Sequence, residues 1–139
     1  MRVLTDSVEI STCGHTDIID ITQQVEQVLW ESELKNGNLT VFVSGSTAGT
    51  TSIEYEPGLL KDLSEVFEKL APTGVTYDHD ATWGDGNGYA HVRAAMLGSS
   101  FTVPFDNGKL LLGTWQQIVV IDFDNRPRKR NVVVQMMGE

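Results

Sequence analysis

The sequence predicts an α+β fold in which two main helices pack on a largely antiparallel β-sheet. Residues 22–34 and 57–70 carry apolar side chains at helical spacing. Much of the remainder consists of short segments rich in β-branched and aromatic residues, which is typical of strands. The last four of these segments follow one another closely, and this favours antiparallel pairing because a parallel return needs a crossover of roughly a dozen residues.

The N-terminal part of the chain is expected to form two strands and the first helix. Residues 2–12 predict a strand, and residues 18–19 predict a short second one. Asp20 or Thr22 can cap a helix that runs to about residue 34 and ends at the sequence Asn-Gly-Asn. Its buried face is expected to contain Val25, Val28 and Leu29.

The middle of the chain predicts two strands and the second helix. Residues 39–43 are expected to be a buried strand, and residues 51–55 a strand that follows a turn of small polar residues at 44–50. Pro57 suits the first turn of a helix, and Pro72 is expected to stop it. The turn could hold a phosphate on its hydroxyl and N–H groups, or it could be an ordinary loop.

The C-terminal part predicts a short helix over residues 90–97, with Gly98 as its end, followed by four strands. The expected strands are residues 101–105, 110–112, 115–123 and 131–137. Residues 117–121 are apolar on both faces, which requires cover on both sides of that strand. Two helices supply limited cover, so we expect a second subunit to contribute.

Length, charge and cysteine content limit the classes of protein to which the chain can belong. The chain of 139 residues fits a single domain, and its net charge of −9 disfavours nucleic acid and anionic membranes as partners. One cysteine, Cys13, allows neither an intrachain disulfide nor a thiolate-rich zinc site, which fits the reducing cytoplasm. No signal peptide or membrane span is expected. The basic residues 126–130 are either a solvated turn or a contact for a phosphate or another subunit.

A glycine-rich segment, residues 84–91, places a carboxylate, an amide and an imidazole among residues that contribute little to a core. We therefore expect His79 and His91 to bind a divalent metal, zinc in the first place, with Asp85 or Glu54 as an oxygen ligand or general base. The same spacing also permits two hydrogen-bonded structural histidines. The sequence contains no phosphate-binding P-loop and no dinucleotide fingerprint, so no nucleotide cofactor is expected.

A series of short motifs adds a resemblance to a known family. In chain order they are Gly84-Asp85-x-Asn87, Ala90-His91, Leu97-Gly98-Ser99-Ser100, Asn107-Gly108-Lys109-Leu110 and Leu112-Gly113-Thr114-Trp115-Gln116. With these motifs the sequence resembles the YjbQ family, often described as secondary thiamine-phosphate synthase, over nearly the full chain. The resemblance implies one α+β domain over residues 1–139 that assembles as a homotrimer around a polar pocket.

The resemblance also implies an activity. It is weak formation of thiamine phosphate from the pyrimidine diphosphate and the thiazole phosphate by a small cytoplasmic enzyme, which a divalent metal could assist. One alternative is a non-catalytic trimeric protein that binds a small phosphorylated metabolite or a metal ion. Another is metal-dependent hydrolysis of a small ester by the same residues.

The family pattern assigns site residues by position. It implies Glu54, Asp85 and His91 as catalytic groups, Asn87, Ser99 and Gln116 as substrate-binding groups, and His79 and His91 as metal ligands. Arg93 is added as a substrate-binding group because it and the cluster at 126–130 are the available cations. Arg93 is expected to help neutralise a leaving pyrophosphate. The chain departs from the pattern at Gly45, where many members carry histidine, and at Ile53, where asparagine is frequent. Glu54 or Asp85 would then replace the missing histidine, or the metal would bind weakly.

Overall fold

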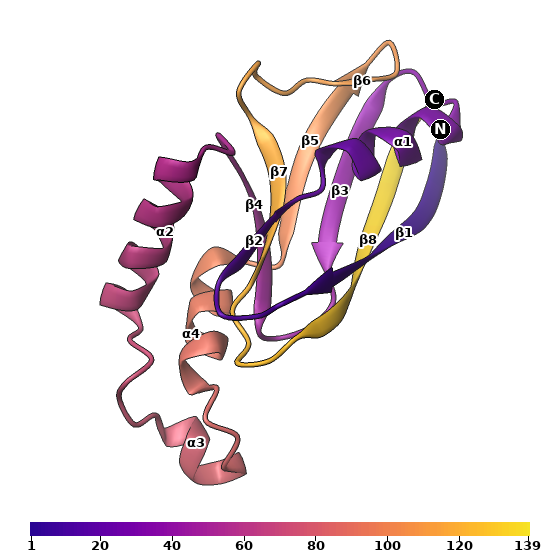
Figure 1. Cartoon of the computed structure of the whole chain (residues 1–139). Coiled ribbons are helices and arrows are strands. Elements are labelled where there is room, and N and C mark those ends of the chain that lie inside the picture. The colour runs from indigo at the N-terminus through magenta and orange to yellow at the C-terminus, as the bar shows by residue number, and fades with distance from the viewer.

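The computed structural model describes residues 1–139 and contains two antiparallel β-sheets and four helices (Figure 1). The predicted α+β class is confirmed, with two sheets where the sequence predicted one. The strands are β1 (Arg2–Thr12), β2 (Asp17–Asp20), β3 (Gly37–Val43), β4 (Ala48–Ile53), β5 (Ser100–Asp106), β6 (Lys109–Leu110), β7 (Gln117–Asp122) and β8 (Arg128–Gly138). The helices are α1 (Thr22–Ser32), α2 (Pro57–Leu70), α3 (Asp78–Trp83) and α4 (Gly88–Leu97).

Each sheet joins segments that are distant in the sequence. The larger sheet has the strand order β1-β8-β3-β5-β6, and the smaller one has the order β2-β7-β4. Arg2 pairs with Gly138, so the first and last strands lie side by side and the two ends of the chain meet at one corner (Figure 1). No helix of the structure is both long and apolar enough to cross a membrane.

The main core lies between the two sheets and beneath α1. One face of the larger sheet buries the alternate residues of β3, β5 and β8, as expected for strands with one face toward the core. The three residues predicted for the buried face of α1 are all buried: Val25, Val28 and Leu29. The opposite face of the sheet is partly polar, and Thr40 and Thr102 hydrogen-bond across it at 3.1 Å.

Strand β7 is covered on both faces by the chain itself. Ile118 and Val120 belong to the core between the sheets, and Val119 and Ile121 pack with residues of α2 and α4. All four side chains are fully buried. The predicted two-sided burial is confirmed, but its inferred cause is not, because α4 and the larger sheet supply the cover that was assigned to a second subunit.

Several boundaries differ from the sequence predictions for local reasons. Helix α1 ends at Ser32, because Glu33 adopts a left-handed conformation, and Gly37 already lies in β3. Strand β4 begins at Ala48, before the predicted position, because its early residues pair with β7. Helix α2 has its predicted bounds, and Glu56 caps it by accepting from the N–H groups of its first turn. Helix α3 was not predicted.

Candidate functional site

Helices α3 and α4 and the loop between them carry the histidines and acidic residues of the candidate site. His79 and Asp80 lie in α3, Asp85 lies in the loop, and Asn87 directly precedes α4. The Asp80 Oδ1 atom accepts a hydrogen bond from the Gly88 N–H at 2.9 Å and so fixes the start of α4 against α3. The loop is also held by Asn125, whose side chain donates to the Asp85 carbonyl at 2.8 Å.

The structure brings the two predicted metal-binding histidines together. The ring centroids of His79 and His91 are 4.1 Å apart, with the planes inclined at 37°. Burial and the neighbouring His79 together lower the pKa of His91, and this outweighs the opposite effect of nearby aspartates. His91 is therefore uncharged near neutral pH, the state in which an imidazole can accept a proton or bind a metal.

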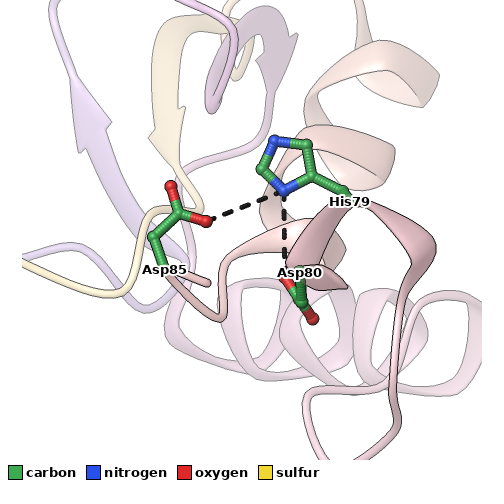
Figure 2. Close-up of side chains that lie close together, drawn as sticks. All are labelled: His79, Asp80 and Asp85. Carbon is green, nitrogen blue, oxygen red and sulfur yellow. Dashed lines mark ion pairs between the residues drawn. The ribbon is translucent and has the colours of Figure 1, made fainter. Parts of the chain in front are cut away.

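His79 directs one ring nitrogen toward two carboxylates (Figure 2). Its Nδ1 atom lies 3.8 Å from Oδ1 of Asp80 and 3.8 Å from Oδ1 of Asp85. These separations are too long for hydrogen bonds, and Nδ1 is buried without any partner. A buried nitrogen that faces two carboxylates without bonding to either indicates a missing partner at this point.

This donor set fits a divalent metal. The potential ligand atoms of His79, Asp80 and Asp85 lie within 4.8 Å of one another. Two ligand atoms on a tetrahedral zinc ion are about 3.4 Å apart, so the observed 3.8 Å separations need to close by only a few tenths of an ångström. His91 is not in this group; it packs against the His79 ring instead. The structure thus groups His79 with two aspartates, whereas the sequence paired it with His91.

His79, Asp85 and His91 line a polar cavity of about 400 Å³. It is lined by the β3–β4 loop, the α3–α4 segment and the first residues of β8: Gly45, Ser46, Thr47, His79, Trp83, Asp85, Asn87, His91, Arg128 and Arg130. A second cavity of similar size shares Gly45, Ser46 and His91 with the first. Ser99 lines this second cavity. The glycine-rich segment and the predicted polar turn therefore face one another.

Two arginines that line the cavity are each paired with a buried aspartate. Arg130 donates to both carboxylate oxygens of Asp122, at 2.7 and 2.9 Å, and to the Thr47 hydroxyl at 2.7 Å. Arg128 donates to Asp124 through Nε at 2.8 Å. Although burial opposes it, hydrogen bonds from Asn125, Asn87, Arg128 and Thr47 lower the pKa of Asp124 to about 2. Of the two alternatives left open for residues 126–130, the solvated turn does not describe these two arginines, because each is paired with a buried aspartate.

Asn87 lines the cavity together with the histidines and hydrogen-bonds to Asp124. Its Nδ2 donates to Asp124 at 3.2 Å, whereas its Oδ1 is buried with no partner. Because the Asp124 carboxylate can only accept, the amide nitrogen must face it, and the amide oxygen is left as an acceptor. Asn87 lines the cavity and is 5% exposed. The cavity therefore contains a second buried polar atom with no partner in the protein.

The remaining predicted residues lie elsewhere. Glu54 and Gln116 line a separate cavity, where Gln116 donates to Ser52 at 2.9 Å, and within one chain they do not join the histidines. Arg93 is 3% exposed and points away from the cavity residues: it donates to the Ala71 carbonyl, to Thr16 and to Glu68. The hydrogen bonds of its guanidinium therefore link the end of α2 to the β1–β2 loop.

Sequence reasoning missed Asp80, Trp83, Asp122 and Asp124 and left Arg128 and Arg130 open between a solvated turn and an anion or subunit contact. One signal was present in the sequence. Asp122 and Asp124 are two residues apart, as are Arg128 and Arg130, and residues two apart in an extended segment share a face. Four charges with this spacing on either side of a short connection favour ion pairs across it, and the structure shows these pairs although β7 and β8 belong to different sheets.

The fold and the cavity together define a class: a small α+β protein whose sheets and α3–α4 segment enclose a cavity lined by imidazole, carboxylate and guanidinium groups. Comparison with known proteins places it more narrowly. The chain belongs to the UPF0047 protein YjbQ-like family, whose model matches residues 6–139.

Relatives in this family resemble the chain over almost its whole length. A UPF0047 protein of Archaeoglobus fulgidus is 42% identical over 128 residues, which cover 92% of this chain and 97% of the relative. The UPF0047 protein YugU of Bacillus subtilis is 35% identical, with 95% and 98% covered. A crystal structure of a YbjQ-like protein of unknown function from Sulfolobus solfataricus superposes with a TM-score of 0.94 at 34% identity, covering 99% of each chain.

Proposed function

We propose that the chain is a divalent-metal-dependent transferase acting on small phosphorylated metabolites, of the secondary thiamine-phosphate synthase type. The observation that carries the metal part is the unpartnered Nδ1 of His79, which faces the carboxylates of Asp80 and Asp85. The resemblance of the sequence to the YjbQ family supplies the reaction. Zinc is the first candidate, because it accepts imidazole and carboxylate ligands together.

The charges in the cavity favour the binding of a metal ion, which would in turn assist a phosphorylated substrate. Asp122 and Asp124 balance Arg130 and Arg128, whereas Asp80 and Asp85 have no arginine or lysine partner. The whole chain adds a net charge of −9. A bound divalent cation would offset the charge of Asp80 and Asp85 and so strengthen the attraction of the cavity for a diphosphate.

The chemistry requires little covalent participation by the protein. The thiazole nitrogen attacks the methylene carbon of the pyrimidine diphosphate; a C–N bond forms, and the C–O bond to pyrophosphate breaks. Pyrophosphate leaves with the bonding electron pair and carries the developing charge. A bound metal would supply charge neutralisation for that leaving group. His79, Asp80 and Asp85 would hold the metal, and Asn87 Oδ1 would accept a hydrogen bond from the substrate.

His91 and Ser99 complete the proposed site. The uncharged His91 packs against His79 and lines both cavities, so it can orient the His79 ring and contact the substrate. Ser99 offers a hydroxyl in the neighbouring cavity, where a second substrate would lie. Glu54, Gln116 and Arg93 take no part in this proposal. The resemblance further leads us to propose a homotrimer, which light scattering of the purified protein would test.

The first experiment is metal analysis of the purified, tag-free protein by plasma mass spectrometry. We expect near-stoichiometric metal in the wild type and a loss of at least about tenfold in His79→Ala, because the variant lacks the nitrogen that both carboxylates face. His15→Ala is the matched control, since His15 is exposed on the turn after β1. A folded wild type that takes up no zinc, or a His79→Ala variant that keeps it, would refute the metal site.

Product analysis then separates catalysis from binding. The metal-loaded protein is incubated with the pyrimidine diphosphate, with and without the thiazole phosphate. Thiamine phosphate that forms only when both are present supports the synthase. Pyrophosphate release without the thiazole indicates hydrolysis. Substrate binding without product indicates the non-catalytic alternative.

A further inference from the structure

We infer that the cavity contains a dedicated anion subsite, in which Arg130 and Arg128 receive a phosphoryl group above Gly45. This deepens the proposed function and rests on it only for the choice of a phosphoryl group as the anion. The subsite lies on the β8 and β3–β4 wall of the cavity, and the candidate metal ligands come from α3 and the loop after it. The subsite is therefore distinct from the candidate metal ligands and can be tested separately.

Arg130 is held rigidly with one nitrogen unused. Its side chain is 8% exposed, and Nε and Nη2 carry all of its hydrogen bonds, to Asp122 and Thr47. None of these bonds uses Nη1. Because the guanidinium is planar and fixed along one edge by a carboxylate, the direction of Nη1 is fixed as well. A buried, oriented N–H donor beside a cavity is suited to an anionic oxygen.

Gly45 leaves this nitrogen accessible. A Cβ atom built at Gly45 would lie 2.7 Å from Nη1 of Arg130, closer than such atoms approach, and φ at Gly45 is +133°. Any side chain here would therefore cover or displace the guanidinium. Arg130 cannot move away easily, since Asp122 and Thr47 hold it. The glycine keeps one face of Nη1 open to the cavity.

Arg128 provides a second donor on the same wall. Its Nε and Nη2 face one oxygen of Asp124, at 2.8 and 2.7 Å, and no hydrogen bond uses its Nη1. The side chain is 33% exposed and lines the cavity. Two guanidinium groups, each held by a buried carboxylate, thus present unused N–H groups to one space. Tetrahedral phosphoryl oxygens match two such donors better than a single carboxylate does.

Isothermal titration calorimetry with inorganic pyrophosphate tests the subsite. Wild type, Gly45→Ala and Arg128→Ala are titrated with the metal removed by a chelator and again with zinc bound. We expect both variants to bind pyrophosphate at least about tenfold more weakly than wild type in each condition, the size expected for a lost hydrogen bond to a charged group. Gly108→Ala is the control, because Gly108 also has a positive φ but lies at the β5–β6 turn. It should bind like wild type.

The outcomes separate this inference from the proposed function. Pyrophosphate binding that Gly45→Ala and Arg128→Ala weaken supports the subsite, even if no metal binds and no product forms. Equal affinity in wild type and both folded variants overturns it, as does a wild type that binds no pyrophosphate in either condition. Acetate is titrated in parallel, and acetate binding as tight as pyrophosphate binding would refute the phosphoryl assignment.

Discussion

Replacing Asp124 by asparagine should remove much of the stability that the chain gains between pH 2 and pH 4. The Asp124 side chain is fully buried and accepts hydrogen bonds from Asn125, Asn87, Thr47 and Arg128. These donors lower its pKa from 3.8 to about 2. A lowered folded-state pKa stabilises the fold at pH values above the unfolded-state pKa, and that contribution is lost as pH falls through the folded-state pKa.

The magnitude follows from these two values. One pKa unit corresponds to about 1.4 kcal/mol, so the fall from 3.8 to about 2 corresponds to roughly 2 kcal/mol of unfolding free energy. Wild type should lose this amount as the pH is lowered from 4 to 2. Asp124→Asn should lack it already at pH 7, because an amide directs an N–H group at donors that now have no acceptor.

Urea unfolding monitored by tryptophan fluorescence between pH 2 and pH 7 checks this prediction. We expect Asp124→Asn to be less stable than wild type by about 2 kcal/mol at pH 7 and to depend less on pH below 4. Asp62→Asn is the control, because Asp62 is exposed on α2. Parallel pH curves for wild type and Asp124→Asn would refute the reasoning.

Two further predictions concern the supports around the site. Arg93→Ala should lower the free energy of unfolding by about 3 kcal/mol, because it leaves the buried Ala71 carbonyl without its donor, while any activity per folded molecule is retained. A selective loss of activity at unchanged stability would instead place Arg93 in the site. Phe123→Ala should cost about 3–5 kcal/mol in urea unfolding, because Phe123 is fully buried, with its ring centroid 4.7 Å from that of Phe67. The exposed Phe42 is the control, and an equal cost for Phe42→Ala would contradict the assigned core.

The α+β class and most elements were predictable because they follow from local patterns. Apolar spacing and Pro57 determine α2, and the run of β-branched residues at 132–134 is typical of the strand that forms β8. Two-sided burial of β7 was predictable for the same reason, since an apolar side chain on each face requires cover on each face. Helix α3 was missed because its six residues bury nothing and show no apolar period.

The candidate site was predictable in its parts and not in its assembly. The sequence by itself determined that His79, Asp85, Asn87 and His91 are polar residues in a glycine-rich setting, where they contribute little to a core. Only the tertiary structure decided that α3 turns back on α4, so that the two imidazole rings touch and Asp80 joins Asp85 at one nitrogen. Periodicity reports which face of an element is buried, and it carries no information on which elements meet.

The charged residues illustrate the same division most clearly. Arg93, Arg128 and Arg130 are equally polar in the sequence, and all three were candidates for binding an anion. The structure buries Arg93 against the end of α2 and places the other two over buried aspartates at the cavity. The physical reason is that a buried charge requires a partner, and partners such as Asp122 are set by strand pairing and by packing across the whole chain.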